Sequence, residues 1–170
     1  MRENFQMFAS YNGWANYRVY MAASKLSDDE YRKDCGVFFK SMHGTLNHIL
    51  VADLIWMGRF EGVSGAPTKL DATLYKDLSS LLEARRELDN RIIGWTNELT
   101  DDQIAGDFTY MPITEPAEVT APLGPCVAHF FNHQTHHRGH AHAILTQLTG
   151  DAPSLDMVEY FRGVREARSN

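Results

Sequence analysis

Hydrophobic residues recur at spacings of three and four over four long stretches of this chain, a pattern that predicts amphipathic helices. The chain has 170 residues, 44% of them hydrophobic, which is enough for one domain with a sizeable core. We therefore predict an all-α fold, a four-helix bundle that occupies residues 1–170 as a single domain. The four helices are expected at residues 3–26, 36–60, 73–99 and 124–148.

Three shorter segments do not belong to these long helices. Ser27 and Glu30 have the spacing of a helix capping box, so a short helical turn is expected over residues 28–34. Residues 100–122 interrupt the helical pattern and are expected to form a loop with a small β-hairpin. A last apolar run, residues 155–161, predicts a short extra C-terminal helix packed over the bundle.

Six of the eight histidines lie within residues 129–142, inside the fourth predicted helix. His133 and His137 are one turn apart and can point at one metal ion. Each could instead be a hydrogen-bonded core residue, and a metal site needs a third ligand from elsewhere. The two histidines share the predicted buried stripe with Cys126, Phe130, Ala141, Ile144 and Leu148.

Outside that cluster only His43 and His48 remain, both on the second predicted helix. Hydrophobic residues surround this helix on nearly all sides, so either histidine could face a neighbouring helix. Small residues next to His48 would leave room for an ion and its waters, and these are Gly44, Thr45 and Ala52. The residues alone favour His48 without excluding His43.

Several polar residues interrupt the hydrophobic stripes. Asp53 needs a partner or an ion, because an isolated buried carboxylate is destabilising by several kcal/mol. We expect Arg138 to pair with it across the helix interface. Arg85 is expected to extend its charge to water, with binding of an internal anion as the alternative. Asn12 is expected to bond a neighbouring helix or, together with Tyr11, to line a pocket.

The formal net charge is −6 and the pI is about 5.7, which disfavours a nucleic-acid partner. The two cysteines, Cys35 and Cys126, form no CxxC motif and fit a reducing compartment. The N-terminus lacks the apolar core of a signal peptide, and no run of about 20 apolar residues could span a bilayer. We expect a cytoplasmic protein with no membrane partner.

Three motifs carry a resemblance to a known family. Residues 46–56 read LNHILVADLIW, residues 131–140 read FNHQTHHRGH, and residues 11–16 read YNGWAN. Together they resemble the DinB-like family, also called YfiT-like, and the match covers essentially the whole chain. The resemblance implies an up-down-down-up four-helix bundle that forms a homodimer.

The resemblance also implies a divalent metal ion held by His48, His133 and His137. Zinc or nickel is expected, although three imidazoles also suit iron or copper. The family motif commonly has glutamine where this chain has His140, which could therefore supply a fourth nitrogen ligand or a titrating group.

Three neutral imidazoles with open coordination positions are typical of a catalytic metal site. The resemblance extends to transferases and isomerases that use low-molecular-weight thiols such as bacillithiol or mycothiol. We therefore expect a metal-dependent S-transferase or a detoxifying enzyme that acts on a small electrophile. One alternative is a metal-water hydrolase with Asp53 or His140 as general base. Another is a non-enzymatic metal-binding protein of a stress response.

Overall fold

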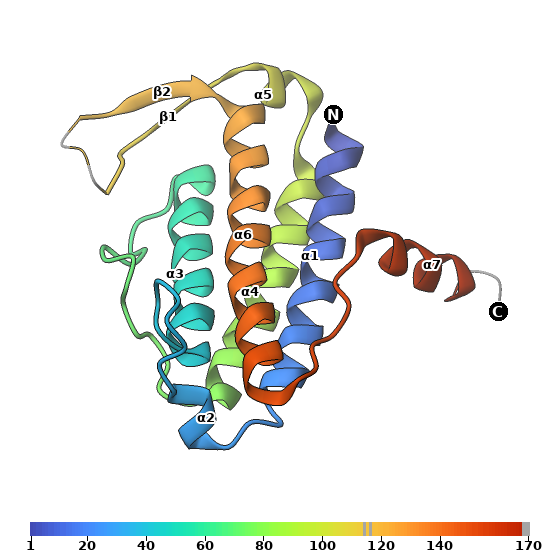
Figure 1. Cartoon of the computed structure of the whole chain (residues 1–170). Coiled ribbons are helices and arrows are strands. Elements are labelled where there is room, and N and C mark those ends of the chain that lie inside the picture. The colour runs from blue at the N-terminus through green and yellow to red at the C-terminus, as the bar shows by residue number, and fades with distance from the viewer. Residues whose placement is uncertain (114, 116, 168–170) are drawn as a thin grey trace.

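Four long helices form the body of the molecule in the computed structural model, which describes residues 1–113, 115 and 117–167 (Figure 1). The helices are α1 (Arg2–Ala23), α3 (Met42–Glu61), α4 (Leu78–Glu98) and α6 (Leu123–Thr149). α1 and α6 run in one direction, while α3 and α4 run in the opposite one. This is the predicted up-down-down-up order. The predicted domain ends at residue 170, and residues 114, 116 and 168–170 lie outside the described ones.

The core lies where the four long helices meet. Each packs against two neighbours, so that α1 contacts α4 and α6, and α3 contacts the same two helices. The buried side chains of this core include Tyr20, Leu46, Ile92, Phe130 and Ile144. α3 and α6 are therefore adjacent and antiparallel (Figure 1), which brings the middle of the histidine-rich helix beside the N-terminal half of α3.

The second long helix starts later than predicted. Residues 36–41 form a turn in which Gly36 and Lys40 have positive φ, and α3 begins after Ser41, whose hydroxyl accepts a hydrogen bond from the Gly44 amide. Phe39, predicted in the helical stripe, lies in this turn instead. Similarly, Asp77 caps α4 at the Ser80 amide, so residues 73–77 stay outside the helix.

The structure contains the three short elements that were predicted and one further short helix, α5. α2 (Asp28–Arg32) has the expected capping box, and α5 (Asp101–Ala105) has another, between Thr100 and Gln103. β1 (Asp107–Tyr110) and β2 (Val119–Pro122) form the expected antiparallel hairpin, with Phe108 opposite Ala121. α7 (Met157–Ala167) is the extra C-terminal helix. It contacts α1 through Tyr160 but extends away from the bundle rather than covering it (Figure 1).

No helix in the part of the chain that the structure describes is both long enough and apolar enough to cross a membrane.

Candidate metal centre

Two imidazoles project from one side of α6 toward α3. His133 and His137 are one helical turn apart, and their ring centroids are 4.4 Å apart. Both are half-buried rather than central to the core, because the buried side of α6 runs through Phe130, Gln134 and Arg138. The prediction that these histidines lie in the middle of the buried stripe is therefore wrong. Their place at its edge leaves one side of each ring accessible.

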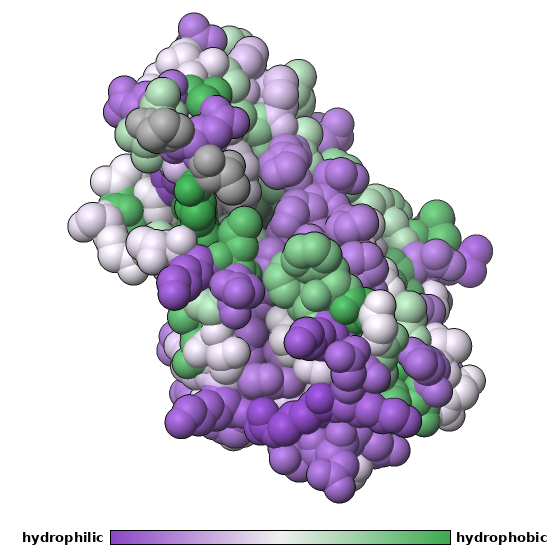
Figure 2. Space-filling view, turned by 60° about the vertical axis from the view of Figure 1, so that its left-hand side comes forward, coloured by the Kyte–Doolittle hydropathy of each residue, from purple (hydrophilic) through white to green (hydrophobic). Residues whose placement is uncertain are grey.

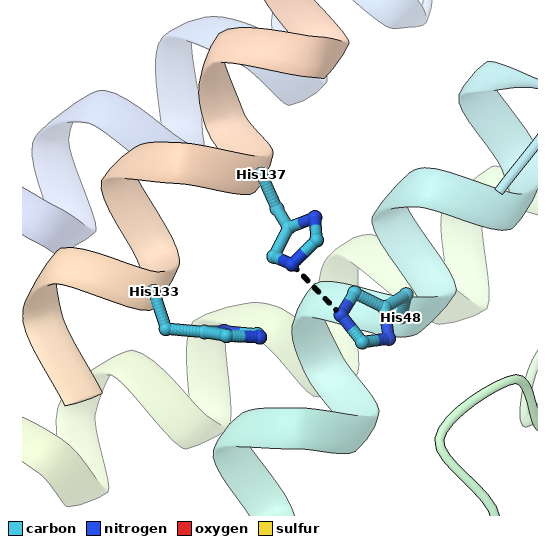
Figure 3. Close-up of side chains that lie close together, drawn as sticks. All are labelled: His48, His133 and His137. Atoms are coloured by element: carbon cyan, nitrogen blue, oxygen red, sulfur yellow. Dashed lines mark hydrogen bonds between the residues drawn. The ribbon is translucent and has the colours of Figure 1, made fainter. Parts of the chain in front are cut away.

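The third imidazole comes from α3. His48 is only 3% exposed, and its Nε2 lies 3.2 Å from Nε2 of His137. Figure 3 shows the three rings of His48, His133 and His137 converging from the two helices. One ring nitrogen of each lies within 4.8 Å of those of the other two. His43 is held elsewhere, since its Nε2 is 3.0 Å from the Tyr75 carbonyl oxygen.

Two contacts fix the orientation of His48. The Phe39 ring stacks on the imidazole with 3.7 Å between centroids, and Nδ1 lies 2.8 Å from the Leu70 carbonyl oxygen. Since a carbonyl can only accept, Nδ1 must carry the proton and donate it to this bond. The lone pair of the neutral ring is then on Nε2, the nitrogen that faces His137. Metal-bound histidines are commonly oriented by such a bond.

Asn47 holds the loop that supplies the Leu70 carbonyl. Its side-chain oxygen accepts hydrogen bonds from the backbone amides of Leu74 and Tyr75, at 2.9 and 3.1 Å. Its amide group donates to the carbonyls of His43 and Tyr75. Asn47 itself is 1% exposed, so this anchor is buried. The residue before His48 thus secures the loop that orients His48.

The environment keeps the cluster neutral. Burial, together with the neighbouring imidazoles, lowers the pKa of His133 to about 4 and that of His137 to about 3. Burial also lowers the pKa of His48, although the bond to Leu70 opposes this. All three rings therefore carry free lone pairs at neutral pH, the form that binds a metal ion.

The geometry fits a divalent ion. Two nitrogens that each lie about 2.05 Å from a tetrahedral zinc ion are about 3.3 Å apart. The 3.2 Å between Nε2 of His48 and Nε2 of His137 agrees with this. Without an ion, Nε2–H of His137 can donate a hydrogen bond to the Nε2 lone pair of His48 over the same distance, the contact that Figure 3 draws. The three imidazoles can therefore hold a metal ion, and among the described residues they provide three ligands and leave further positions open.

The remaining histidines of α6 lie around this centre. His140 does not join His48 and His133. It groups instead with His136 and His137, each again offering one nitrogen within 4.8 Å of the others. Its ring centroid is 5.2 Å from that of His137, and burial lowers its pKa. His129 is exposed and packs against Trp56 with 5.3 Å between ring centroids.

Asp53 does not pair with Arg138, which corrects the prediction. Its Oδ2 accepts a hydrogen bond from Nη1 of Arg85 at 2.5 Å, and both side chains are 1% exposed. Arg85 also contacts Asp89 at 2.9 Å. Burial raises the pKa of the Asp53 carboxyl, while the adjacent guanidinium lowers it. Arg85 therefore does not extend to water. Its guanidinium binds the carboxylates of Asp53 and Asp89 inside the bundle. The second expected role of Arg85, binding an anion in the interior, is closer to this arrangement.

Arg138 faces α1 instead of α3. Its guanidinium donates to the side-chain oxygens of Asn12 and Asn16, the latter at 3.1 Å. Asn16 in turn donates to Asp89 at 3.0 Å, which links Arg138 to the group around Arg85. Asn12 thus bonds a neighbouring helix, the first of its two expected roles. Tyr11 was expected to line a pocket, but its hydroxyl donates to the Leu155 carbonyl at 2.7 Å.

Sequence reasoning missed the residues that orient the centre. Phe39 was expected inside a helix, and nothing in the sequence marks the Leu70 carbonyl as a partner of His48. Asn47 did offer a signal, because a buried amide directly before a candidate ligand must satisfy its hydrogen bonds locally. Gly36 was expected to begin the second helix, whereas in the structure it has positive φ and belongs to the turn before α3.

The fold is an antiparallel helical bundle, and the three imidazoles that converge between two of its helices could hold a metal ion. The model of the DinB family matches residues 1–167, and the chain belongs to this family. It is also similar to Protein DinB of Bacillus subtilis (strain 168), with 26% identity over 148 residues, covering 81% of each chain. The resemblance inferred from the three motifs is thereby confirmed.

Proposed function

We propose that this protein is a metal-dependent transferase that joins a low-molecular-weight thiol to a small electrophile, with His48, His133 and His137 as the metal ligands. The observation that supports this proposal is the set of three neutral imidazoles, of which His48 is buried while His133 and His137 remain partly exposed. A purely structural zinc site would use four protein ligands. Zinc and nickel are the proposed ions, since both accept imidazole nitrogen.

A divalent ion bound there would lower the pKa of a thiol or a water molecule that reached it. The protein contributes orientation and shielding. His48 keeps its Nε2 lone pair available because Nδ1 donates to Leu70, and the Phe39 ring covers one side of the imidazole. The protein's own thiol at Cys126 is an unsuitable nucleophile, because it is 7% exposed and burial raises its pKa.

A proton acceptor near the substrate is the second requirement. Of the two candidates, His140 is better placed than Asp53. His140 is half-buried beside His137, and its Nδ1 makes no hydrogen bond within the described residues. Asp53 is enclosed in the ion pair with Arg85. It also lies five residues after His48, about 140° around α3 from the ligand. We therefore propose His140 as the general acid or base.

Homodimerisation, which the family resemblance implies, remains a prediction.

The test begins with untagged protein, since an oligohistidine tag binds nickel itself. Elemental analysis should find about one divalent ion per chain, and His137→Ala should lose it. His142→Ala is the matched control, because His142 lies on the same helix and outside both histidine groups. The purified protein is then incubated with a panel of thiols and electrophiles.

Turnover that needs both the ion and the added thiol supports the proposal. Turnover without a thiol would assign a metal-water hydrolase instead. A stoichiometric ion with no turnover on either panel would favour the non-enzymatic alternative. Loss of the ion from His142→Ala but not from His137→Ala would overturn the assignment of the ligands.

A further inference from the structure

A pocket of about 420 Å³ extends from the histidine cluster along α3 to the hairpin. His133 forms part of its wall at one end, and Arg59 and Tyr110 form part of it further along. Figure 2 turns the α3 side of the molecule forward and shows hydrophobic surface gathered in the recess beside the hairpin. The pocket is therefore the space in which a substrate could approach the proposed metal centre.

Arg59 is held in this pocket by two aromatic rings. Its guanidinium carbon lies 4.7 Å from the centre of the Trp56 ring and 4.9 Å from that of Tyr110. Both rings also line the pocket. Such contacts engage the flat faces of the guanidinium and leave its N–H groups, which lie in the plane, free to donate.

No carboxylate of the described residues lies within ion-pair distance of Arg59, and its side chain makes no hydrogen bond to them. This contrasts with Arg91 on the adjacent helix α4, which pairs with Glu61. Arg59 is half-buried, and burial lowers its pKa, as expected for a cation that has lost part of its water without gaining an anion. Glu115 is the one carboxylate among the described residues of the pocket wall, and it forms no ion pair with Arg59.

We propose that Arg59 binds a carboxylate of the small molecule that reacts at the histidine cluster. A planar guanidinium with free N–H groups matches a carboxylate with two parallel hydrogen bonds. This inference rests on the proposed function, because it places the reacting atom of the ligand near His133. The carboxylate could belong to the thiol or to the electrophile.

The positions also constrain the ligand. Arg59 lies 11 positions after His48, which corresponds to about 16 Å along the helix axis. The arginine side chain leans toward the N-terminus of the helix and shortens this gap. The carboxylate and the reacting atom must therefore be several bonds apart, so an acid as small as acetate would not reach both sites.

The test uses cobalt-substituted protein, because a thiol that reaches Co²⁺ produces a charge-transfer absorption band. Two thiol series of equal lengths are titrated: 3-mercaptopropionate, 6-mercaptohexanoate and 8-mercaptooctanoate against the corresponding mercaptoalcohols. At the chain length that reaches Arg59, the acid should bind about 10-fold more tightly than the alcohol. Arg59→Gln should remove this preference and leave the affinity for the alcohol unchanged. Glu115→Gln is the matched control, and it should keep or increase the preference for the acid over the alcohol.

Equal affinities for acid and alcohol at every length would overturn the proposal, as would the same preference in Arg59→Gln. If neither series changes the cobalt spectrum, the thiol chemistry of the proposed function is wrong, and the anion site is tested separately. The metal-free protein is then titrated with hexanoate by calorimetry. Binding that Arg59→Gln abolishes supports the site, and equal binding or no binding refutes it.

The same reagents identify the source of the carboxylate. If hexanoate and 6-mercaptohexan-1-ol bind at the same time, the carboxylate belongs to the second substrate. If each excludes the other, it belongs to the thiol.

Discussion

Replacing Asp53 by asparagine separates a structural role of this residue from a catalytic one. In the structure Asp53 and Arg85 form a fully buried ion pair, with 2.5 Å between oxygen and nitrogen. Arg85 keeps a second carboxylate, Asp89, at 2.9 Å. The substitution preserves the shape of the side chain and removes one of the two negative charges next to the guanidinium.

The size of the effect follows from this arrangement. Breaking a buried ion pair typically lowers the free energy of unfolding by about 3–5 kcal/mol, because the remaining charge stays buried. Asp89 still offsets part of the Arg85 charge, so we expect the lower end, about 3 kcal/mol. In a domain of this size, each kcal/mol corresponds to a shift of about 2–4 °C in Tm, which gives a decrease of about 6–12 °C.

The measurement is thermal and urea unfolding of the metal-free protein, followed by circular dichroism. Asp28→Asn is the matched control, because Asp28 pairs with Arg32 at 2.9 Å on the surface, where its side chain is 75% exposed. Loss of the ion pair between Asp28 and Arg32 should lower the free energy of unfolding by less than about 1 kcal/mol. Metal content should be the same in both variants.

A decrease of less than about 1 kcal/mol in Asp53→Asn would refute the reasoning. It would mean that the pair is not formed in solution or that Asp89 alone neutralises Arg85. If stability and metal content are unchanged while turnover is lost, Asp53 acts as the general base after all, and the assignment of that role to His140 is wrong.

Three further outcomes are expected. Adding zinc at 100 times its Kd should raise the free energy of unfolding by about 2.7 kcal/mol, and calorimetry should show no such gain in His137→Ala. The metal-free protein should lose stability as the pH falls from 6.5 toward 4, because the unfolded chain then binds protons at His133 and His137 that the folded chain excludes. A double His→Asn variant at these positions should show a smaller decrease over the same titration. Arg138→Met should lower the free energy of unfolding by about 2 kcal/mol, because the side-chain oxygens of Asn12 and Asn16 lose their hydrogen-bond donor. Urea unfolding measures this change, and the m-value should stay the same.

The helices could be predicted because their evidence is local. Spacings of three and four identify a helix wherever hydrophobic residues meet one core, and capping residues such as Ser27 act within a single turn. The start of α3 could not be predicted in the same way. Phe39 fits the helical stripe, but Ser41 caps the helix after it, and the Phe39 ring stacks on His48, a contact between residues that the periodicity does not reveal.

The pairings across helices were harder to predict than the helices themselves. A helical wheel shows that Asp53 and Arg85 each interrupt a stripe and that Arg138 lies beside one, but it does not show which helices are neighbours. Arg138 was assigned to Asp53 on the assumption that its side of α6 faces α3. It faces α1, and Arg85 from α4 reaches Asp53 instead.

The same assignment explains the error about the histidines of α6 and gives it a functional meaning. Hydrophobicity alone places Gln134 and Arg138 outside and His133 inside, yet Gln134 and Arg138 are 0% and 2% exposed. Arg138 bonds to α1, and on another side of α6 His133 faces both α3 and the pocket. Fully buried imidazoles could hold an ion but could not present it to a substrate. The side of α6 that packs in the core carries Gln134 and Arg138, and this orientation leaves His133 and His137 partly exposed at the proposed metal centre.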